Sequence, residues 1–190
     1  MNVWRGFLGL HFIVPMRLHQ LKVEYRPEED RLLIRLATDT GAEVLLWLTR
    51  RCVARLWPVL LNMAQATPEV QLQHNPEARK ALLGFQHEKA IRQANFSKPY
   101  EEAERERPLG AEPLLITRIQ PRRDPQGRNV LGLLPAIGQG VHLTLDDNLM
   151  HGLMRLLQNA VKKSEWSLDL ALPSGMAPIV DTAGGHPTIN

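Results

Sequence analysis

Hydrophobic and polar residues alternate along the first third of the chain. Apolar side chains occupy every second position over residues 21–25, and the alternation returns over 32–36 and 44–48. Turn-forming sequences at residues 27–30 and 39–41 separate these segments. The pattern predicts a meander of three antiparallel strands, each with one buried face.

A helix is predicted directly after the third strand. Thr49 is suited to cap its first turn, and apolar residues from Val53 to Met63 recur on one helical face. Pro58 lies inside this segment, so we expect a kink or a break, because proline removes a backbone hydrogen bond and crowds the preceding turn. The short alternation over 70–73 then predicts a fourth, edge-like strand.

The second half of the chain repeats this order. Strands are predicted over 114–119, 130–134 and 141–145, and Asp146 is a strong candidate to cap a second helix. A final strand is predicted over 166–172, where apolar residues alternate once more.

An internal duplication would explain the repeated order. Residues 41–63 and 138–160 align without a gap and share seven identical positions, four of them leucines. The alternative is two unrelated stretches with the same layout. We predict an α+β fold of two similar antiparallel β-meander plus helix units, joined by a helical linker.

The chain divides into five expected parts. The linker contains a helix over 78–94 with a thin apolar stripe, followed by a solvated charged run at 100–107. From N- to C-terminus the parts are a loosely attached extension (1–15), the first unit (16–74), the linker (75–112), the second unit (113–172) and a disordered tail (173–190).

Composition limits the function classes. The chain has 23 Lys and Arg residues against 20 Asp and Glu, and the net charge of +3 is too mild to name a partner. A hydrophobic content of 44% supports a packed core and excludes a disordered chain. No segment is long and apolar enough to span a membrane, so we expect no membrane partner.

Cys52 is the only cysteine. A single cysteine excludes disulfides within the chain and multi-cysteine zinc sites, and it is typical of a cytoplasmic protein. Beside Arg50 and Arg51 it is either a reactive thiol or, as we favour, a small buried hydrophobic residue.

No motif of a known catalytic chemistry is present. The sequence lacks a P-loop, a nucleophile elbow and a dinucleotide-binding motif, so an enzyme is our third hypothesis, and no catalytic residue, metal or cofactor is predicted. The densest group of candidate ligands is His142, Asp146, Asp147 and His151. Both histidines fall off the apolar faces of their elements and are expected at the surface, with His87 on a polar helix face. The aspartates are explained as cap and first-turn carboxylates.

Two features point to a protein partner. Leu45 and Trp47 place apolar side chains on the second face of the first meander, which is expected to meet the linker helix, the other unit or another chain. Arg50, Arg51 and Arg55 begin the first helix, where their charge opposes the helix dipole. They either face carboxylates of the second half or of another copy, or form a solvated face. Our leading hypothesis is a non-enzymatic binding or assembly protein, acting through this sheet face and the linker helix on a protein partner or as a dimer.

The alternative hypothesis is binding of single-stranded nucleic acid. Arginines concentrate along one predicted hairpin, and a basic β-ribbon can follow a phosphate backbone. The sequence VHLTLDDNLMHGLMRLLQNAV, over 141–161, resembles the strand, cap and helix that end each repeat in the transcriptional-coactivator, PUR and Whirly group of single-stranded nucleic-acid binders. The resemblance covers 114–163 and, less closely, 18–66. The residues that would bind nucleic acid are Arg118, Arg122, Arg123 and Arg128.

Overall fold

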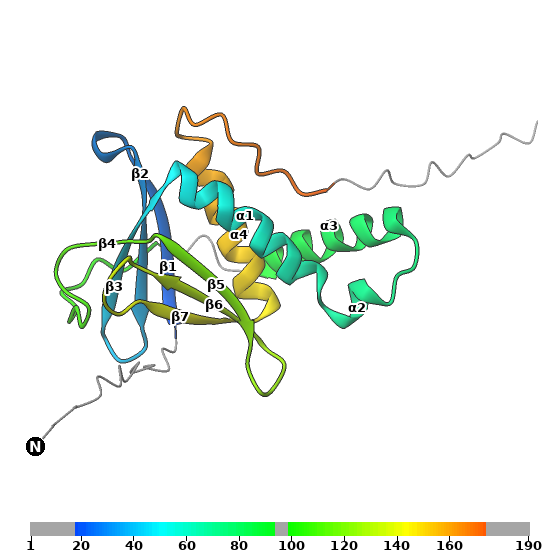
Figure 1. Ribbon diagram of the computed structural model, residues 1–190, viewed down its shortest axis with the longest axis horizontal. Helices are drawn as coiled ribbons and strands as arrows, with labels where there is room; N and C mark the ends of the chain where they lie inside the picture. The colour runs from blue at the N-terminus through cyan, green and yellow to red at the C-terminus, as the bar shows by residue number, and fades with distance from the viewer. Residues whose placement is uncertain (1–17, 94–98, 174–190) are drawn as a thin grey trace, which may run out of the picture.

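The computed structural model describes residues 18–93 and 99–173. The extension predicted for 1–15 and the predicted tail, apart from Pro173, lie outside this part of the chain. Within it, two β-meanders, each followed by a helix, confirm the predicted α+β class (Figure 1). Whether the two units arose by duplication stays a prediction.

The first meander consists of β1 (Leu18–Arg26), β2 (Arg31–Thr38) and β3 (Glu43–Thr49), paired antiparallel in that order. A short 3-10 turn, η1 (Pro27–Glu29), joins the first two strands. The alternation of the sequence puts one apolar set on the inner face, where it is buried. The fully buried members of this set are Leu32, Ile34, Leu36, Leu46 and Leu48.

Helix α1 (Arg50–Gln65) follows β3 without a loop. Its start is fixed by Thr49, whose Oγ1 accepts a hydrogen bond from the Cys52 amide at 3.2 Å. The helix continues through Pro58, so the expected break is wrong. Pro58 lies on the exposed side of α1, where its ring displaces no core side chain.

Two helical elements follow α1 in the chain. The strand predicted for 70–73 is wrong, because Pro68 begins the helical turn α2 (Pro68–Gln71), in which Val70 is buried. Helix α3 (Pro76–Gln93) confirms the predicted linker helix, with Asn75 Oδ1 accepting from the Glu77 amide at 2.8 Å. It packs against α4 (Asp147–Val161) and projects away from the sheets (Figure 1).

The strand predicted over 114–119 divides between the two sheets. Its first part, β4 (Leu114–Leu115), pairs in parallel with β3, and its second part, β5 (Arg118–Arg123), opens the second meander. Between them the Ile116 amide donates to Trp47 O and the Thr117 amide donates to Leu134 O, both at 3.0 Å. The chain therefore changes sheets within two residues.

The second sheet has the order β5-β6-β7 and ends in α4. β6 (Asn129–Leu134) and β7 (Val141–Leu145) complete the antiparallel meander, and Asp146 caps α4 by accepting from the Leu149 amide at 2.7 Å. These elements lie where the sequence predicts them.

The strand predicted over 166–172 is wrong. The segment forms no strand and pairs with no other described strand, and Ser167 has a positive φ of 50°. Its alternation buries Trp166 and Leu170 against the core, and the Trp166 indole donates to the Asp30 carboxylate. Alternate burial here comes from packing rather than from a β-ladder.

The two units pack reciprocally. α1 contacts β5 of the second unit, α4 contacts β1 of the first, and α1 and α4 lie side by side (Figure 1). A constant offset of 97 residues relates α1 to α4 and β3 to β7. The inner-face positions of β1 and β5 are related by an offset of 98 residues instead, because Leu21 pairs with Leu36 whereas Ile119 pairs with Leu133.

We predict that Gly140→Ala destabilises the protein. A Cβ atom at Gly140 would lie 2.3 Å from Leu133 O and 2.8 Å from Leu134 Cα, so backbone must move. The free energy of unfolding, measured by urea denaturation, should fall by about 2 kcal/mol or more. The matched control is Gly84→Ala on α3, where nothing lies within 4 Å of the new methyl group. It should leave stability unchanged or raise it by up to about 1 kcal/mol, and equal losses in both variants would contradict the packing at Gly140.

Candidate functional site

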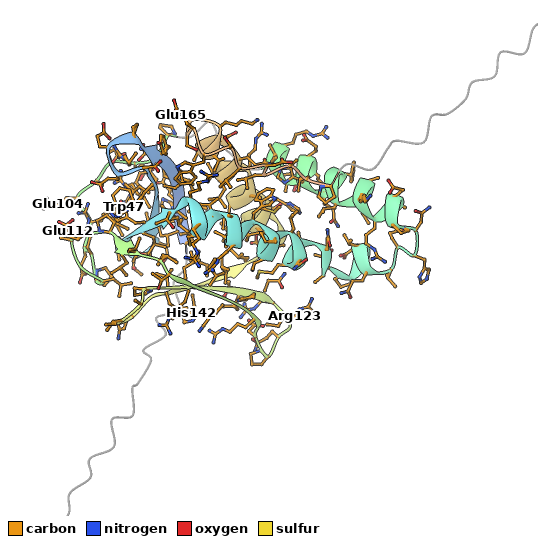
Figure 2. The ribbon with its side chains drawn as sticks, turned by 45° about the horizontal axis from the view of Figure 1, so that its top comes forward. Trp47, Glu104, Glu112, Arg123, His142 and Glu165 are labelled. Atoms are coloured by element: carbon orange, nitrogen blue, oxygen red, sulfur yellow. The ribbon has the colours of Figure 1, made fainter. Side chains whose placement is uncertain are left out.

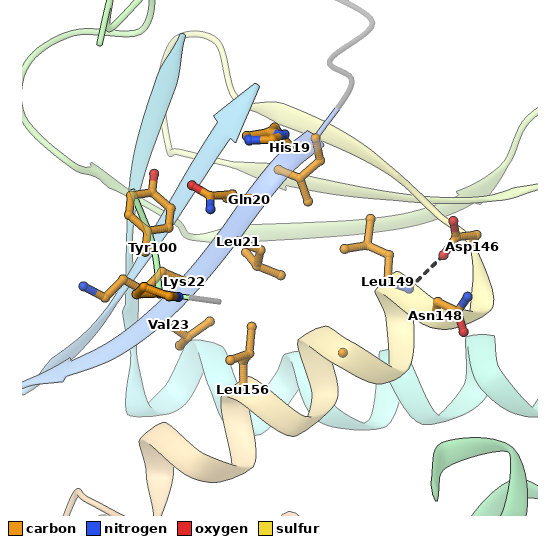
Figure 3. Close-up of a pocket in the computed structure, with 13 residues that line it drawn as sticks. His19, Gln20, Leu21, Lys22, Val23, Tyr100, Asp146, Asn148, Leu149 and Leu156 are labelled. Carbon is orange, nitrogen blue, oxygen red and sulfur yellow. Dashed lines mark hydrogen bonds between the residues drawn. The ribbon is translucent and has the colours of Figure 1, made fainter. Parts of the chain in front are cut away.

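A groove runs between β1 and α4 (Figure 3). Its volume is about 700 Å³. Leu21 and Val23 project from β1 toward Leu149 and Leu156 of α4, while Tyr100 stands on the opposite side of β1. The remaining lining residues are Leu18, His19, Gln20, Lys22, Pro99, Asp146, Asn148 and Gly152.

The strand wall of this groove is a sheet edge. β1 pairs only with β2 among the described strands, so the backbone amides and carbonyls of alternate residues point away from the sheet. β1 contains no proline, and every one of its residues can therefore donate a backbone hydrogen bond. The helix wall is apolar at Leu149 and Leu156, and Gly152 between them carries no side chain.

A buried ion network holds Tyr100 at the mouth of the groove. Glu43 is 1% exposed on the outer face of the first sheet, the face opposite α1 and α4. Its Oε1 accepts from Arg35 Nη2 at 2.8 Å and from the Tyr100 hydroxyl at 2.8 Å, and its Oε2 accepts from Arg107 Nη2 at 3.1 Å. The Arg35 guanidinium lies 4.5 Å from the centre of the Tyr100 ring and also binds Glu102 at 2.6 Å.

The surroundings of Glu43 keep it ionised. Burial by itself would raise its pKa, but hydrogen bonds from Tyr100 and Arg35 and the charge of Arg35 hold the pKa below its ordinary value. Burial and the bond to Glu43 in turn raise the pKa of Tyr100 to about 12. The carboxylate is thus paired and fully hydrogen-bonded, which a buried charge requires.

The sequence predicts that the charged run 100–107 is solvated. The structure differs, because this segment is bonded to the first sheet. It folds back over the outer face of the first sheet, where the Glu43 amide donates to Glu106 O at 2.8 Å. A glutamate at an outward position of a strand gives no indication of burial in sequence, because its partners lie on a distant segment.

This backfolding changes the predicted partner surface. Leu45 is buried, at 8% exposure, on the outer face that the charged run crosses, and α3 packs on α4 instead of on this face. Trp47 is half-buried and pairs with Leu115, which is 40% exposed. Figure 2 shows Trp47 at the same end of the molecule as Glu104 and Glu112.

The two predicted groups of arginines have different surroundings. Arg50, Arg51 and Arg55 are exposed and bind no other described residue, so the structure pairs none of them with carboxylates of the second half.

In the hairpin, three of the four arginines are engaged within the chain. Arg118 donates to Pro135 O at 3.1 Å, Arg123 donates to Ala66 O at 2.8 Å, and Arg128 pairs with Asp124 at 2.6 Å, which leaves Arg122 without a partner among the described residues.

Two histidines expected at the surface are buried. His87 on α3 and His151 on α4 are 3% and 2% exposed, and their Nδ1 atoms lie 3.1 Å apart. One Nδ1–H donates to the Nδ1 of the other ring, so at least the accepting ring must be neutral, because a doubly protonated imidazole has no lone pair to accept with. Burial lowers both pKa values, and the pKa of His87 falls to about 4, helped by the neighbouring His151. The prediction fails because each ring satisfies the other across a helix interface that sequence periodicity does not reveal.

The group predicted as the densest set of candidate ligands does not come together. His151 faces His87, Asp146 caps α4, and no group of three or more histidine, cysteine or carboxylate side chains in the described residues could hold a metal ion.

Burial raises the pKa of Cys52 to about 11, against the charge of Arg55, so its thiol stays protonated at neutral pH. None of the described helices is long and apolar enough to cross a bilayer.

Comparison with known proteins finds no family model, curated protein or solved structure that matches the chain.

We predict that Glu43→Gln lowers the free energy of unfolding by about 3 kcal/mol, because Arg35 and Arg107 lose the carboxylate that balances their charge. Since the folded-state pKa is depressed, the stability that Glu43 contributes is present at neutral pH and is lost as pH falls through that pKa. Urea denaturation at several pH values measures both effects. The control Glu104→Gln removes an exposed carboxylate from the same segment and should change stability by less than about 0.5 kcal/mol. Comparable losses in the two variants would show that Glu43 is not buried in the network.

The histidine pair predicts acid sensitivity. The unfolded chain binds protons at pH values where folded His87 does not, so unfolding should become easier as pH falls from about 6.5 toward 4, by up to about 3 kcal/mol. Replacing both residues, His87→Leu with His151→Leu, should flatten this slope, whereas His74→Gln at an exposed position should keep it. Urea denaturation midpoints measured across this pH range test the prediction. An unchanged dependence of the midpoint on pH in the double variant would contradict a buried His87–His151 pair as its cause.

Proposed function

We propose that this chain is a non-catalytic binding protein that takes up an extended segment of a partner protein in the groove between β1 and α4. The observation that carries this proposal is the combination of a strand edge that no other described strand pairs with and a helix wall that is apolar at Leu149 and Leu156. An added strand gains affinity from backbone hydrogen bonds and specificity from pockets for alternate side chains.

The groove defines the chemistry of the segment. Its strand wall extends from Leu18 to Val23, which is the length of a short strand. Alternate side chains of a bound strand would point toward Leu149 and Leu156, and these positions favour apolar residues. On the other side of β1 the bound strand would meet Tyr100, whose position the Glu43 network fixes.

The same geometry supports a protein ligand over a nucleic acid. Single-stranded nucleic acid is held by free cations and by aromatic platforms on which bases stack. Only Arg122 of the four predicted hairpin arginines lacks a partner among the described residues, and the described strands of the second sheet carry no Phe, Tyr or Trp. Nucleic-acid binding therefore remains our second hypothesis.

The segment could come from a different protein or from a second copy of this chain, and the leading proposal is a different protein.

We also propose the cytoplasm as the compartment of this chain, because its single cysteine is a buried thiol with a raised pKa. No catalytic role is proposed, since the titratable groups with shifted pKa values in the described residues serve internal contacts.

Selection of random peptides against the full-length chain tests this function. We expect the selected peptides to share apolar residues at alternate positions and to bind in fluorescence anisotropy titrations. Leu149→Lys, at a half-buried position of the helix wall, should raise the dissociation constant at least about tenfold.

The matched control is Ile137→Lys, because Ile137 is 90% exposed in the turn between β6 and β7, away from the groove. This variant should bind as the unchanged protein does. The proposed function fails if no peptide is selected, or if the selected peptides bind equally well after Leu149→Lys in a variant whose circular dichroism is unchanged.

A further inference from the structure

A second groove lies between α1 and β5, the helix and strand that correspond to α4 and β1 of the first groove. It has a volume of about 270 Å³. Its floor is apolar, formed by Val59, Met63, Ala66 and Pro121, and its rim carries Arg122, Arg123 and two asparagines, Asn62 and Asn129. No acidic side chain lines this groove among the described residues, and the nearby Asp124 is paired with Arg128.

Free positive charge continues from this groove along α1. Arg51 and Arg55 lie on the same helical face as Val59 and Asn62, because they precede them by whole turns of the helix. Both arginines are exposed, and neither binds another described residue. Their place in the first turns of α1 opposes the helix dipole, so helix stability does not account for them.

The two grooves therefore differ in chemistry. The first has an edge strand whose residues all carry a backbone N–H and a helix wall with apolar Leu149 and Leu156, whereas the second has an arginine rim. Pro121 interrupts the edge of β5, since proline has no backbone N–H to donate to an added strand. A ligand of the second groove is held by its side chains instead of by a β-ladder.

The size and lining indicate which polyanion fits. The groove is smaller than an ordinary ligand pocket of about 300 to 1,000 Å³, so it accepts one large apolar side chain. Its lining contains no aromatic residue, which disfavours a stacked nucleic-acid base. Carboxylates on either side of an apolar anchor would meet Arg55 and Arg122.

We infer that the α1–β5 groove is a second docking site, for an acidic segment of a partner protein with a single large apolar residue at its centre. The site is independent of the β1–α4 groove and uses different residues. With both occupied, the protein links an apolar extended segment to an acidic one.

A labelled peptide in which aspartates and glutamates flank one tryptophan is the probe. At low salt it should bind the full-length chain in anisotropy titrations, and binding should weaken as salt rises. The double variant Arg55→Gln with Arg122→Gln should raise the dissociation constant at least about tenfold. Lys89→Gln with Lys163→Gln removes the same charge at exposed positions elsewhere and should change it less than about twofold.

Two further probes distinguish the alternatives. A peptide with serine in place of the tryptophan should bind at least about tenfold more weakly, because the apolar floor is then left empty. An oligothymidine of similar charge should bind more weakly than the tryptophan peptide. The inference is overturned by no binding of the acidic peptide, by equal binding of the serine peptide, by tighter binding of the oligothymidine, or by equal losses in the two double variants.

Discussion

Reciprocal packing of the two helices against the opposite sheets is the constraint on which the structure depends. A single three-stranded meander has an apolar inner face that must be covered. Here α4 packs on β1 and α1 packs on β5, so each helix covers a strand of the unit to which it does not belong. The inner faces and both helices consequently form one hydrophobic core.

The two grooves follow from this arrangement. Each lies where a helix passes the first strand of the other meander, and in both cases that strand is a sheet edge. The lining residues then make the sites different. Leu149, Gly152 and Leu156 leave the first groove apolar, whereas Arg122, Arg123 and Pro121 make the second basic and unsuited to strand addition. The linker covers the outer face of the first sheet through Glu43 and brings Tyr100 to the first groove.

Local patterns in the sequence predict most of the fold. Alternation gives β1, β2, β3, β6 and β7, and Thr49 and Asp146 mark where both helices begin. Alternation fails at residues 166–172, because packing on a core produces the same pattern as pairing in a sheet. It also fails at 70–73, where Pro68 starts a helical turn.

The site was less predictable, because its parts come from distant segments. Glu43 and Tyr100 meet only when the linker folds back, and His87 meets His151 only when α3 packs on α4. The groove likewise joins β1 to α4, the first and last elements of the described chain. The arginine groups stand out in the sequence, but only the structure separates the arginines engaged within the chain from those without a partner among the described residues.

Amide hydrogen exchange of β1 in the free, full-length chain tests the central claim most directly, because strand addition requires an available edge. Alternate amides of β1 bond to β2 and the others point away from the sheet. The account predicts an alternation of slow and fast exchange along Gln20–Tyr25, where the pairing with β2 is regular, and this stretch becomes uniformly slow when a selected peptide is added. Uniformly slow exchange in the free chain would show that the edge is already paired, and it would contradict the proposal.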